Sequence, residues 1–445
     1  MPVLTPAPRQ HLARQSLALA RDQEALRKRK ERALASANAA PELASELKRQ
    51  AAALHENERL LGLLRSRLAP SVGTEDLLDA AHLIGSMAPG PDYGASVDGV
   101  LQYLRRDWGR EPQSEREVRA LSTAVRDALR AAKVRSRPVV VLGAGVGRVS
   151  HMLAADHADV IAIEHSVAMT LAHELLLEGP LAFKVVRRDN LRFGSTPVMS
   201  VTCRSVAQPR SLSWLIADAC ACPLASGSAG AVVSCYFSDV VRPSLWVPEV
   251  SRILARGGVF VHVGPLGFHF EEAHEKRSAD QFVELLGYHG LRVRRRSSVT
   301  STHLVDPDLC VRMLIENLVV IAEKVSAPIV HRVGASSVLR FAPGTKVVTT
   351  QSITDSSKQT EKCLVQTRGG QSCELSEFGP ALLEVIDGRK TFDEIRTDIA
   401  EQIGAGALST EHLGLVTEDV QRLLEAGAIR ARRGRRAPSQ SIRTT

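Results

Sequence analysis

Aromatic residues are scarce in this chain of 445 residues, at 4% of all positions. Proteins that hold single-stranded nucleic acid stack the bases on aromatic side chains, so this scarcity argues against nucleic acid as a partner. No apolar run of about 18 residues is present, which argues against a membrane-spanning helix and a membrane partner. The first ten residues hold three prolines and lack the apolar stretch of a secretory signal. We therefore expect a cytoplasmic globular protein.

Cysteine is also sparse, with seven residues scattered between positions 203 and 373. An odd, scattered set does not indicate a disulfide framework, and reduced thiols suit a cytoplasmic protein. Cys220 and Cys222 form a C-x-C pair without a second pair at the spacing of zinc ligands. We therefore expect no metal site.

The net charge of +8 is concentrated at the two ends of the chain. Residues 1–70 hold 13 Lys and Arg against 7 Asp and Glu, and residues 430–445 hold six Arg and no acid. The middle of the chain is therefore slightly acidic. Basic arms of this kind could contact nucleic acid, but a solvated, flexible tail is the simpler interpretation for the arginine-rich end.

A run of aliphatic residues at 139–142 leads directly into three closely spaced glycines and then a helix start at 149–155. A strand, a tight glycine turn and a helix N-terminus expose backbone N–H groups where a ligand can approach closely. A second aliphatic run, 160–163, ends at Glu164, which could bind a ribose hydroxyl pair. The pattern predicts a nucleoside cofactor on a parallel sheet. The glycine spacing alone does not choose among NAD, FAD and S-adenosyl-L-methionine (SAM), and a chance glycine turn is the alternative.

The order of the next elements narrows the cofactor. A strand ends at Asp218, a buried strand follows at 231–239, residues 245–254 suggest a helix, and an R-G-G turn at 256–258 precedes a strand at 259–263. This order resembles the class I SAM-dependent methyltransferases. The resemblance implies that Asp218 binds the adenine amino group and Glu164 the ribose. The expected cofactor-binding residues are Gly143, Ala144, Gly145, Gly147, Arg148, Glu164, Asp218, Ala219 and Cys235.

Three stretches together resemble the carnosine N-methyltransferase family over residues 95–325: the R-D-W helix at 101–108, the C-Y-F-S-D strand end at 235–239, and the G-P-L-G-F-H-F loop at 264–270. That family transfers a methyl group from SAM to an imidazole nitrogen of a histidine-containing dipeptide. The resemblance implies that Asp239 and His269 contact the substrate imidazole. The expected substrate-binding residues are Trp108, Tyr236, Phe268 and His303. His303 stands where the family has tyrosine, which puts the small dipeptide in doubt as substrate.

The chemistry supports these two catalytic residues independently. Methyl transfer from a sulfonium is an in-line displacement, so the protein mainly positions the reactants. A carboxylate at Asp239 would hold the N–H of the imidazole nitrogen that does not react and stabilise the cation as it forms. His269 could orient the ring or take the departing proton near neutral pH. The alternatives are a helix N-cap role for Asp239, a loop histidine bonded to backbone for His269, and plain packing for Trp108.

The C-terminal part has a helical pattern from 375 to 386, a D-G turn, a capping box formed by Thr391 and Glu394, and a third helix at 417–426 closed by Gly427. This pattern resembles the small winged-helix family of the pyrroloquinoline-quinone peptide chaperone, also called the RiPP recognition element (RiPP: ribosomally made, post-translationally modified peptide). The resemblance implies that residues 336–432 bind the leader of a precursor peptide. The leader would add a strand to a sheet formed by residues 338–376. A winged-helix DNA-binding domain is the alternative. The helix at 417–426 holds three acids and one arginine, so DNA phosphates would be repelled.

We therefore predict an α/β protein, with a Rossmann-like class I methyltransferase domain between an N-terminal helical region and a C-terminal winged-helix (α+β) domain. The expected segments are a helical arm at 1–70, a helical cap at 71–135 with helices at 74–88 and 96–133, the methyltransferase domain at 136–330, a linker and leader-binding domain at 331–432, and a basic tail at 433–445. The stretch 325–361 is expected to be irregular in part. The arm would pack on its own catalytic domain or on a partner copy, giving a homodimer.

The predicted function is SAM-dependent N-methylation of a histidine in a ribosomal peptide. Methylation of a peptide carboxylate or amine, methylation of a small histidine-containing molecule, and a scaffold without catalysis are the alternatives.

Overall fold

The computed structural model describes residues 9–73, 77, 97–132, 134, 137–187, 190–269, 276–325, 337–354, 357–366, 372–402, 410–425 and 428–433. The chain divides into an N-terminal unit, residues 1–271 and 276–328, and a C-terminal unit, residues 272–275 and 329–445. The helix expected at 74–88, apart from Leu77, lies outside the described residues, as do Phe270, Gly427 and the tail beyond Arg433.

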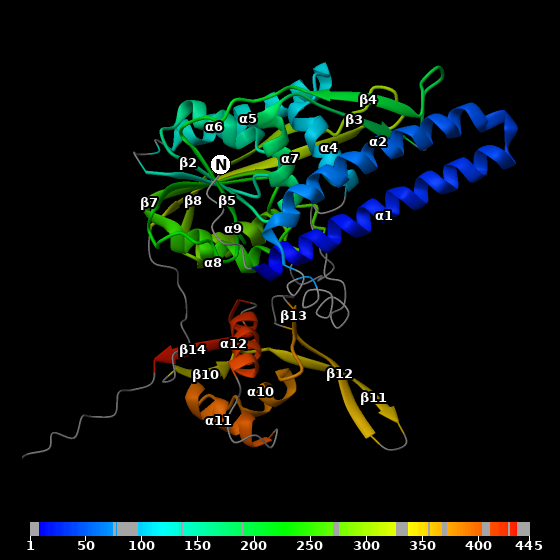
Figure 1. Cartoon of the computed structure of the whole chain (residues 1–445). Helices are drawn as coiled ribbons and strands as arrows, with labels where there is room; N and C mark the ends of the chain where they lie inside the picture. The colour runs from blue at the N-terminus through cyan, green and yellow to red at the C-terminus, as the bar shows by residue number, and fades with distance from the viewer. Residues whose placement is uncertain are drawn as a thin grey trace, which may run out of the picture. The chain divides into compact units, whose positions relative to one another are not determined.

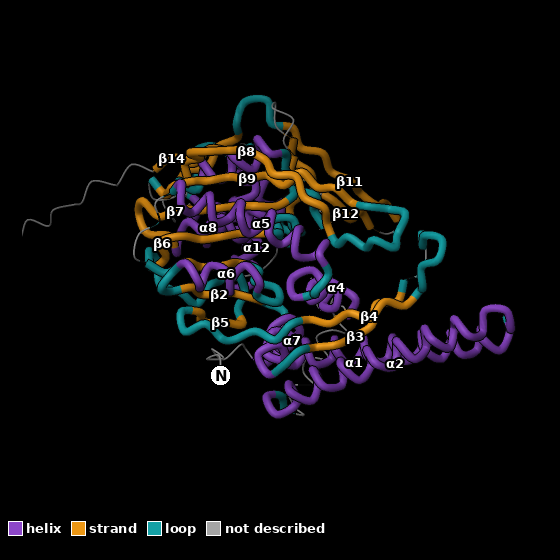
Figure 2. The backbone as a smooth tube through the Cα atoms, turned by 90° about the horizontal axis from the view of Figure 1, so that it is seen from above, coloured by secondary structure: helices purple, strands orange, loops and turns teal. Residues whose placement is uncertain are grey.

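A seven-stranded sheet in the order β5-β2-β1-β6-β7-β9-β8 forms the centre of the N-terminal unit (Figure 2). The first four pairings in this order are parallel, whereas β9 pairs antiparallel with both of its neighbours. The central strands β1 and β2 are almost purely aliphatic because both faces of the sheet are covered. The strands are β1 (Val139–Leu142), β2 (Val160–Glu164), β5 (Leu212–Ile216), β6 (Ala229–Cys235), β7 (Leu254–Gly264), β8 (Leu291–His303) and β9 (Met313–Lys324).

Alternate residues of each strand pack on opposite layers of helices. Val139 and Val141 of β1 join a core with α5 (Pro112–Ala131) and α6 (Arg148–Asp156). Val140 and Leu142 join a second core with α8 (Pro243–Ile253) and α9 (Ala279–Tyr288). The predicted helices at 149–155 and 245–254 are confirmed by α6 and α8. The predicted R-G-G turn at 256–258 is wrong, because these residues lie within β7, where its register with β6 shifts between Ala229 and Ala231.

The N-terminal arm is a hairpin of two long helices, α1 (Arg9–Ala39) and α2 (Ala44–Leu68), joined by a short 3₁₀ turn (Figure 1). It packs on α4 (Val97–Trp108), on α7 (Val167–Glu178) and on the hairpin of β3 (Leu181–Val186) and β4 (Val198–Cys203). Asn57 fixes the arm to the edge of β3, since its amide donates to the Lys184 carbonyl at 2.7 Å and accepts the Lys184 N–H at 3.1 Å. The arm therefore packs on its own catalytic unit.

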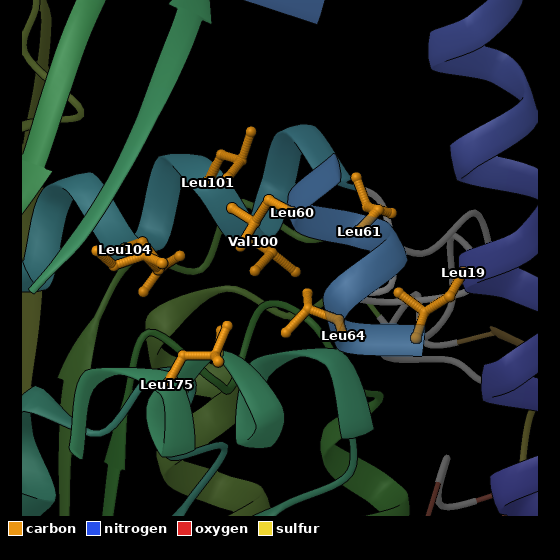
Figure 3. A pocket seen from close by; sticks show the side chains of 10 residues that line it. Leu19, Leu60, Leu61, Leu64, Val100, Leu101, Leu104 and Leu175 are labelled. Atoms are coloured by element: carbon orange, nitrogen blue, oxygen red, sulfur yellow. The ribbon is translucent and has the colours of Figure 1, made fainter. Parts of the chain in front are cut away.

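The seam between the arm and the catalytic unit is closely packed. Leucines from α1 and α2 face Val100, Leu101 and Leu104 of α4 and Leu175 of α7 (Figure 3). The void among them measures about 10 Å³, the space of a single water, and its lining is apolar. A void of this size and polarity stays dry, so the seam holds no ligand.

The C-terminal unit has its own hydrophobic core. The three-stranded sheet β11-β12-β13 and the pair β10-β14 surround three helices, and the elements are β10 (Ser337–Phe341), β11 (Lys346–Thr354), β12 (Ser357–Gln366), β13 (Ser372–Leu375), α10 (Gly379–Val385), α11 (Phe392–Gln402), α12 (Thr410–Glu425) and β14 (Ile429–Arg433). The sheet expected from residues 338–376 is confirmed by β11, β12 and β13. The stretch 325–361, expected to be irregular in part, is regular where β10, β11 and β12 form, because cross-strand pairing stabilises these polar sequences. The capping box is confirmed: Thr391 and Glu394 each bond the other's backbone N–H. None of the described helices is long and apolar enough to cross a membrane.

Candidate active site

The glycine turn after β1 provides a surface that a ligand can approach. Gly143, Gly145 and Gly147 all have positive φ, at 60°, 59° and 92°. A Cβ at Gly143 would lie 2.5 Å from the Phe237 ring, and one at Gly147 would lie 2.9 Å from the Trp214 ring, so protein fills the space beside both. A Cβ at Gly145 would meet no atom of the described residues within 4 Å. The turn is therefore packed from behind and open at Gly145, as a closely bound cofactor requires.

Glu164 lies directly beside this turn at the end of β2. Its carboxylate accepts the Gly145 N–H and the Ser166 N–H, both at 2.7 Å. Burial raises the pKa of Glu164 to about 7, although these backbone hydrogen bonds oppose the shift. A carboxylate has about four acceptor positions, so these backbone hydrogen bonds do not use all of them and a ribose hydroxyl can also donate to Glu164.

Asp218 and Ala219 follow β5, which is the parallel neighbour of β2. Parallel strands end at the same edge of a sheet, so Asp218 lies at the same edge as Glu164. The Asp218 side chain is exposed, and one of its oxygens accepts the Cys220 N–H at 2.8 Å. Ala219 is buried beneath it. An exposed carboxylate beside a buried alanine suits an adenine ring whose amino group donates to the acid.

The loop after β6 forms the second half of the site. Tyr236 directly follows β6 with a φ of 55°, a left-handed conformation that costs a non-glycine residue about 1–3 kcal/mol. Gly264 at the end of β7 allows this turn, since a Cβ there would lie 3.1 Å from the Tyr236 nitrogen. The His269 N–H donates to the Asp239 carbonyl at 2.9 Å, which joins the G-P-L loop to the end of β6.

The structure brings the two predicted catalytic residues, Asp239 and His269, close together. The His269 Nε2 lies 3.6 Å from the Asp239 Oδ2, with the imidazole 65% exposed and the carboxylate 6% exposed. The other carboxylate oxygen, Oδ1, is buried and has no hydrogen-bond partner among the described residues. Burial raises the pKa of Asp239, and the charges of His269, His303 and Arg106 oppose that shift. A buried, unpartnered acceptor is costly unless a ligand uses it.

Arg106 is a site residue that the sequence reasoning missed. Its guanidinium bonds Asp107 at 2.6 Å and lies 4.7 Å from the Tyr103 ring centre and 5.6 Å from the Tyr236 ring centre. Its Nη1 is buried without a hydrogen-bond partner in the described part of the chain. The nearby Asp107 carboxylate raises the pKa of Arg106 against the opposing effect of burial. The R-D-W motif already contained this arginine and could have indicated it.

Glu117 is the second missed residue. Its buried carboxylate lies 3.2 Å from the His303 Nδ1 and accepts the Leu304 N–H at 2.8 Å. The His303 ring stacks on Tyr236, with ring centres 5.1 Å apart and planes 19° from parallel. A carboxylate that accepts from Nδ1 leaves the Nε2 nitrogen of the imidazole available. Glu117 lies within α5, an amphipathic helix, and no local motif marks it.

The remaining predicted site residues lie around this centre. Trp108 is buried, and its indole N–H donates to the Val146 carbonyl of the glycine turn at 2.7 Å. Arg148 stacks on the Trp108 ring at 4.9 Å and pairs with Glu115. Cys235 ends β6, and burial raises the pKa of its thiol to about 12. Ala144 is buried and Phe268 is half-buried.

The hydrogen bond from Trp108 to the Val146 carbonyl shows that Trp108 supports the glycine turn. Its role in substrate binding stays a prediction.

The strand order with one antiparallel strand, the glycine turn after β1 and the acids ending β2 and β5 define a class I SAM-dependent methyltransferase. The chain belongs to the carnosine N-methyltransferase family, whose model matches residues 91–316, just over half of the chain. The protein is therefore a methyltransferase, and SAM is its methyl donor. The open face of Gly145 and the two acids fit that cofactor.

Several solved structures resemble the chain. A putative methyltransferase from Bacillus halodurans is 13% identical and covers 46% of this chain and 100% of its own, with a TM-score of 0.33. A chain from the complex between the Haloferax volcanii Trm112 methyltransferase activator and the putative methyltransferase is 16% identical over 50% of this chain and 95% of its own, with a TM-score of 0.32. Geranyl diphosphate C-methyltransferase from Streptomyces coelicolor A3(2) is 13% identical over 46% of this chain and 76% of its own, with a TM-score of 0.30. No curated protein sequence matches the chain.

Proposed function

We propose that this protein methylates an imidazole nitrogen of a histidine in a ribosomally synthesised peptide. The observation that carries the proposal is the buried Asp239 carboxylate, with one oxygen near His269 and the other without a partner in the described residues. Bound SAM supplies an electrophilic methyl group. The glycine turn, Glu164 and Asp218 would hold it at the ends of β1, β2 and β5, next to the end of β6.

Asp239 would orient the substrate. Its open oxygen accepts the N–H of one imidazole nitrogen, which directs the lone pair of the other nitrogen at the methyl carbon. Formation of the N–C bond at the expense of the C–S bond would move the positive charge of the sulfonium onto the imidazole ring, next to Asp239. A negative charge held in a buried site stabilises that cation more strongly than it would in water. The ring then loses its N–H proton to Asp239, and the exposed His269 passes it to solvent.

His303, Glu117 and Tyr236 would form the wall that contacts the rest of the substrate. A histidine paired with a buried carboxylate replaces the tyrosine of the family at position 303, so the wall differs in charge and shape. This difference favours a histidine within a larger molecule over the free dipeptide. The small dipeptide stays the alternative substrate.

The C-terminal unit would recruit the peptide through its leader, in the manner of a RiPP recognition element with a winged-helix arrangement. In the order β11-β12-β13, β13 is an end strand, which is the position where a leader would pair as an added strand. Helix α12 packs beside β13, and its buried Asp419 accepts the backbone N–H of Ser376, just after that strand. The acids of α12 would repel DNA phosphates, which disfavours DNA binding as the function of this unit.

A substrate panel tests this function with the full chain. Release of S-adenosyl-L-homocysteine is measured with histidine-containing peptides, with the same peptides carrying alanine in place of histidine, and with carnosine. We expect turnover only where a histidine is present and, by mass spectrometry, a methyl group on its ring. Methyl transfer to the alanine peptides would show that a carboxylate or amine is the acceptor and would exclude the imidazole.

The Asp239→Asn and His269→Ala variants test the mechanism in the same assay. Asparagine keeps the shape of the side chain and removes its charge, so we expect kcat to fall by about 10²-fold, the usual scale for a positioned acid–base group, while SAM affinity stays unchanged. His269→Ala should show a loss of similar size. Asp280→Asn on the exposed start of α9 is the matched control and should keep full activity. A fully active Asp239→Asn enzyme would contradict the proposed role.

A further inference from the structure

The start of helix α1 reaches the cofactor site from a distant part of the chain. His11 lies 154 positions before His165, and its Nε2 is 2.8 Å from the His165 carbonyl oxygen. The two imidazole rings are also in contact, with centres 4.1 Å apart and planes tilted by 45°. A carbonyl oxygen can only accept, so the Nε2 of His11 carries the proton and donates it.

This contact fixes the turn that positions Glu164. His165 directly follows Glu164, and the next residue, Ser166, donates its backbone N–H to the Glu164 carboxylate. Ser166 is also the N-cap of α7, since its hydroxyl accepts the Met169 N–H. The His11 bond therefore holds the peptide unit between the ribose-binding carboxylate and the start of α7.

The loop that carries the second cofactor acid starts beside the same turn. The Ala217 N–H, one residue before Asp218, donates to the Glu164 carbonyl at 3.1 Å. Burial lowers the pKa of His11 and the neighbouring His165 lowers it further, while the hydrogen bond to the His165 carbonyl and the charge of Asp218 oppose these effects. His11 bonds the residue after Glu164, so it lies near the loops after β2 and β5, which carry the acids proposed for the ribose and the adenine.

The start of α1 is an anchored part of the catalytic unit. Ala13, Gln15 and Ser16 are buried within the first two turns after His11. Leu19, one turn further, enters the apolar seam with α2, α4 and α7 (Figure 3). The packing of these residues fixes where His11 lies, so its bond to His165 costs little additional ordering of the chain.

We propose that the first turns of α1 form the outer wall of the adenosine site, and that His11 is a positioning residue for SAM. It holds the His165 carbonyl and thereby the Glu164 turn in the geometry that binds the nucleoside. The arm then has a functional role: it completes the cofactor site of its own chain. This inference rests on SAM binding and is independent of the acceptor.

The test compares three variants of the full chain by calorimetric titration with SAM. His11→Ala removes the donor and should raise the Kd for SAM about 10-fold. His11→Gln keeps an N–H donor of similar reach and should restore most of that affinity. His55→Ala removes an exposed imidazole from α2 of the same arm and should leave the Kd unchanged.

Two further measurements separate positioning from a structural role. The melting temperature of the SAM-free His11→Ala protein should match that of the His55→Ala protein. With an acceptor that the wild-type enzyme methylates, His11→Ala should raise KM for SAM and leave kcat unchanged. This result is expected because the His11 contact stabilises bound SAM equally in the ground state and in the transition state. An unchanged Kd in His11→Ala, a His11→Gln protein as weak as His11→Ala, or a melting temperature lowered only in His11→Ala would each overturn the inference. Normal SAM binding by the wild-type chain in those cases would leave the cofactor assignment intact.

Discussion

At the residue scale, Gly145 is the point where the glycine turn is open to a ligand. Gly145→Asp places a side chain in a space that none of the described residues occupies, so we expect SAM binding to be lost. Gly227→Asp is a matched control, because Gly227 has a φ of 71° and an equally open Cβ position outside the glycine turn. Both substitutions carry the same backbone strain. Calorimetry with SAM should therefore detect binding only in the Gly227 variant, and binding by both would show that the cofactor lies elsewhere.

Glu164 predicts a pH dependence of cofactor binding. Burial raises its pKa from 4.5 to about 7, so the SAM-free protein is partly protonated there near neutral pH. Ribose hydroxyls donate to the ionised form, so binding favours the carboxylate and releases a proton below pH 7. SAM affinity should therefore rise as pH increases from about 6 to 8. Calorimetric titrations with SAM in buffers of different ionisation enthalpy measure the proton release. The Glu164→Gln variant should bind SAM without the proton release that Glu164 causes.

The same shift affects stability in the absence of SAM. The folded protein binds the Glu164 proton more tightly than the unfolded chain does, so this residue favours the folded state below pH 4.5. That contribution is lost as pH rises towards about 7. Its upper bound is about 3 kcal/mol, from about 1.4 kcal/mol for each pKa unit. A Glu164→Gln protein should keep its stability over this range, as denaturant titration at several pH values will measure.

At the element scale, the capping box of α11 stabilises the C-terminal unit. Thr391 and Glu394 satisfy each other's backbone N–H groups at the start of the helix. Thr391→Ala removes one of these bonds and should lower the free energy of unfolding of this unit by about 1 kcal/mol. Thr397→Ala in the interior of the same helix is the control, since that hydroxyl bonds only the Asp393 carbonyl. Equal stability of the two variants, measured by urea unfolding, would contradict the cap.

At the scale of the whole molecule, the two units are proposed to divide recognition and chemistry. Removal of residues 336–445 should raise KM for a precursor peptide with its leader by orders of magnitude and leave the Kd for SAM unchanged. Leader binding raises the effective concentration of the modified segment at the catalytic site, and truncation abolishes this gain. A leaderless histidine peptide is the control, because its KM should be the same for both proteins. Equal KM values for the complete precursor would remove the leader-binding role.

The homodimer through the N-terminal helices stays a prediction. The arm covers its own catalytic unit with one face, and Leu34 and Leu43, near the turn of the hairpin, are 44% and 48% exposed. Leu63 of α2 is also 44% exposed, so a dimer through the arm has apolar surface at both places. Light scattering of the wild-type chain and of a Leu34→Ser, Leu43→Ser variant measures whether such a dimer forms.

The sequence by itself determined the cofactor half of the site. Glycines at 143, 145 and 147, and acids that end two aliphatic runs, are local patterns, and the physics of strands, turns and helix starts acts over a few residues. The family motifs also indicated Asp239 and His269. The hairpin of β3 and β4 was not predicted, because its strands are stabilised by pairing with each other and cross-strand pairing is not a local property.

The tertiary structure alone decided which distant groups meet. Glu117 reaches His303 across 186 positions, and His11 reaches His165 across 154. Neither residue lies in a motif, since such contacts depend on how helices pack on a sheet whose strand order differs from chain order. The sequence therefore determined the reaction class and cofactor, while packing decided which side chains complete the site. Local propensities act between neighbours in the chain, whereas burial and hydrogen bonding act between neighbours in space.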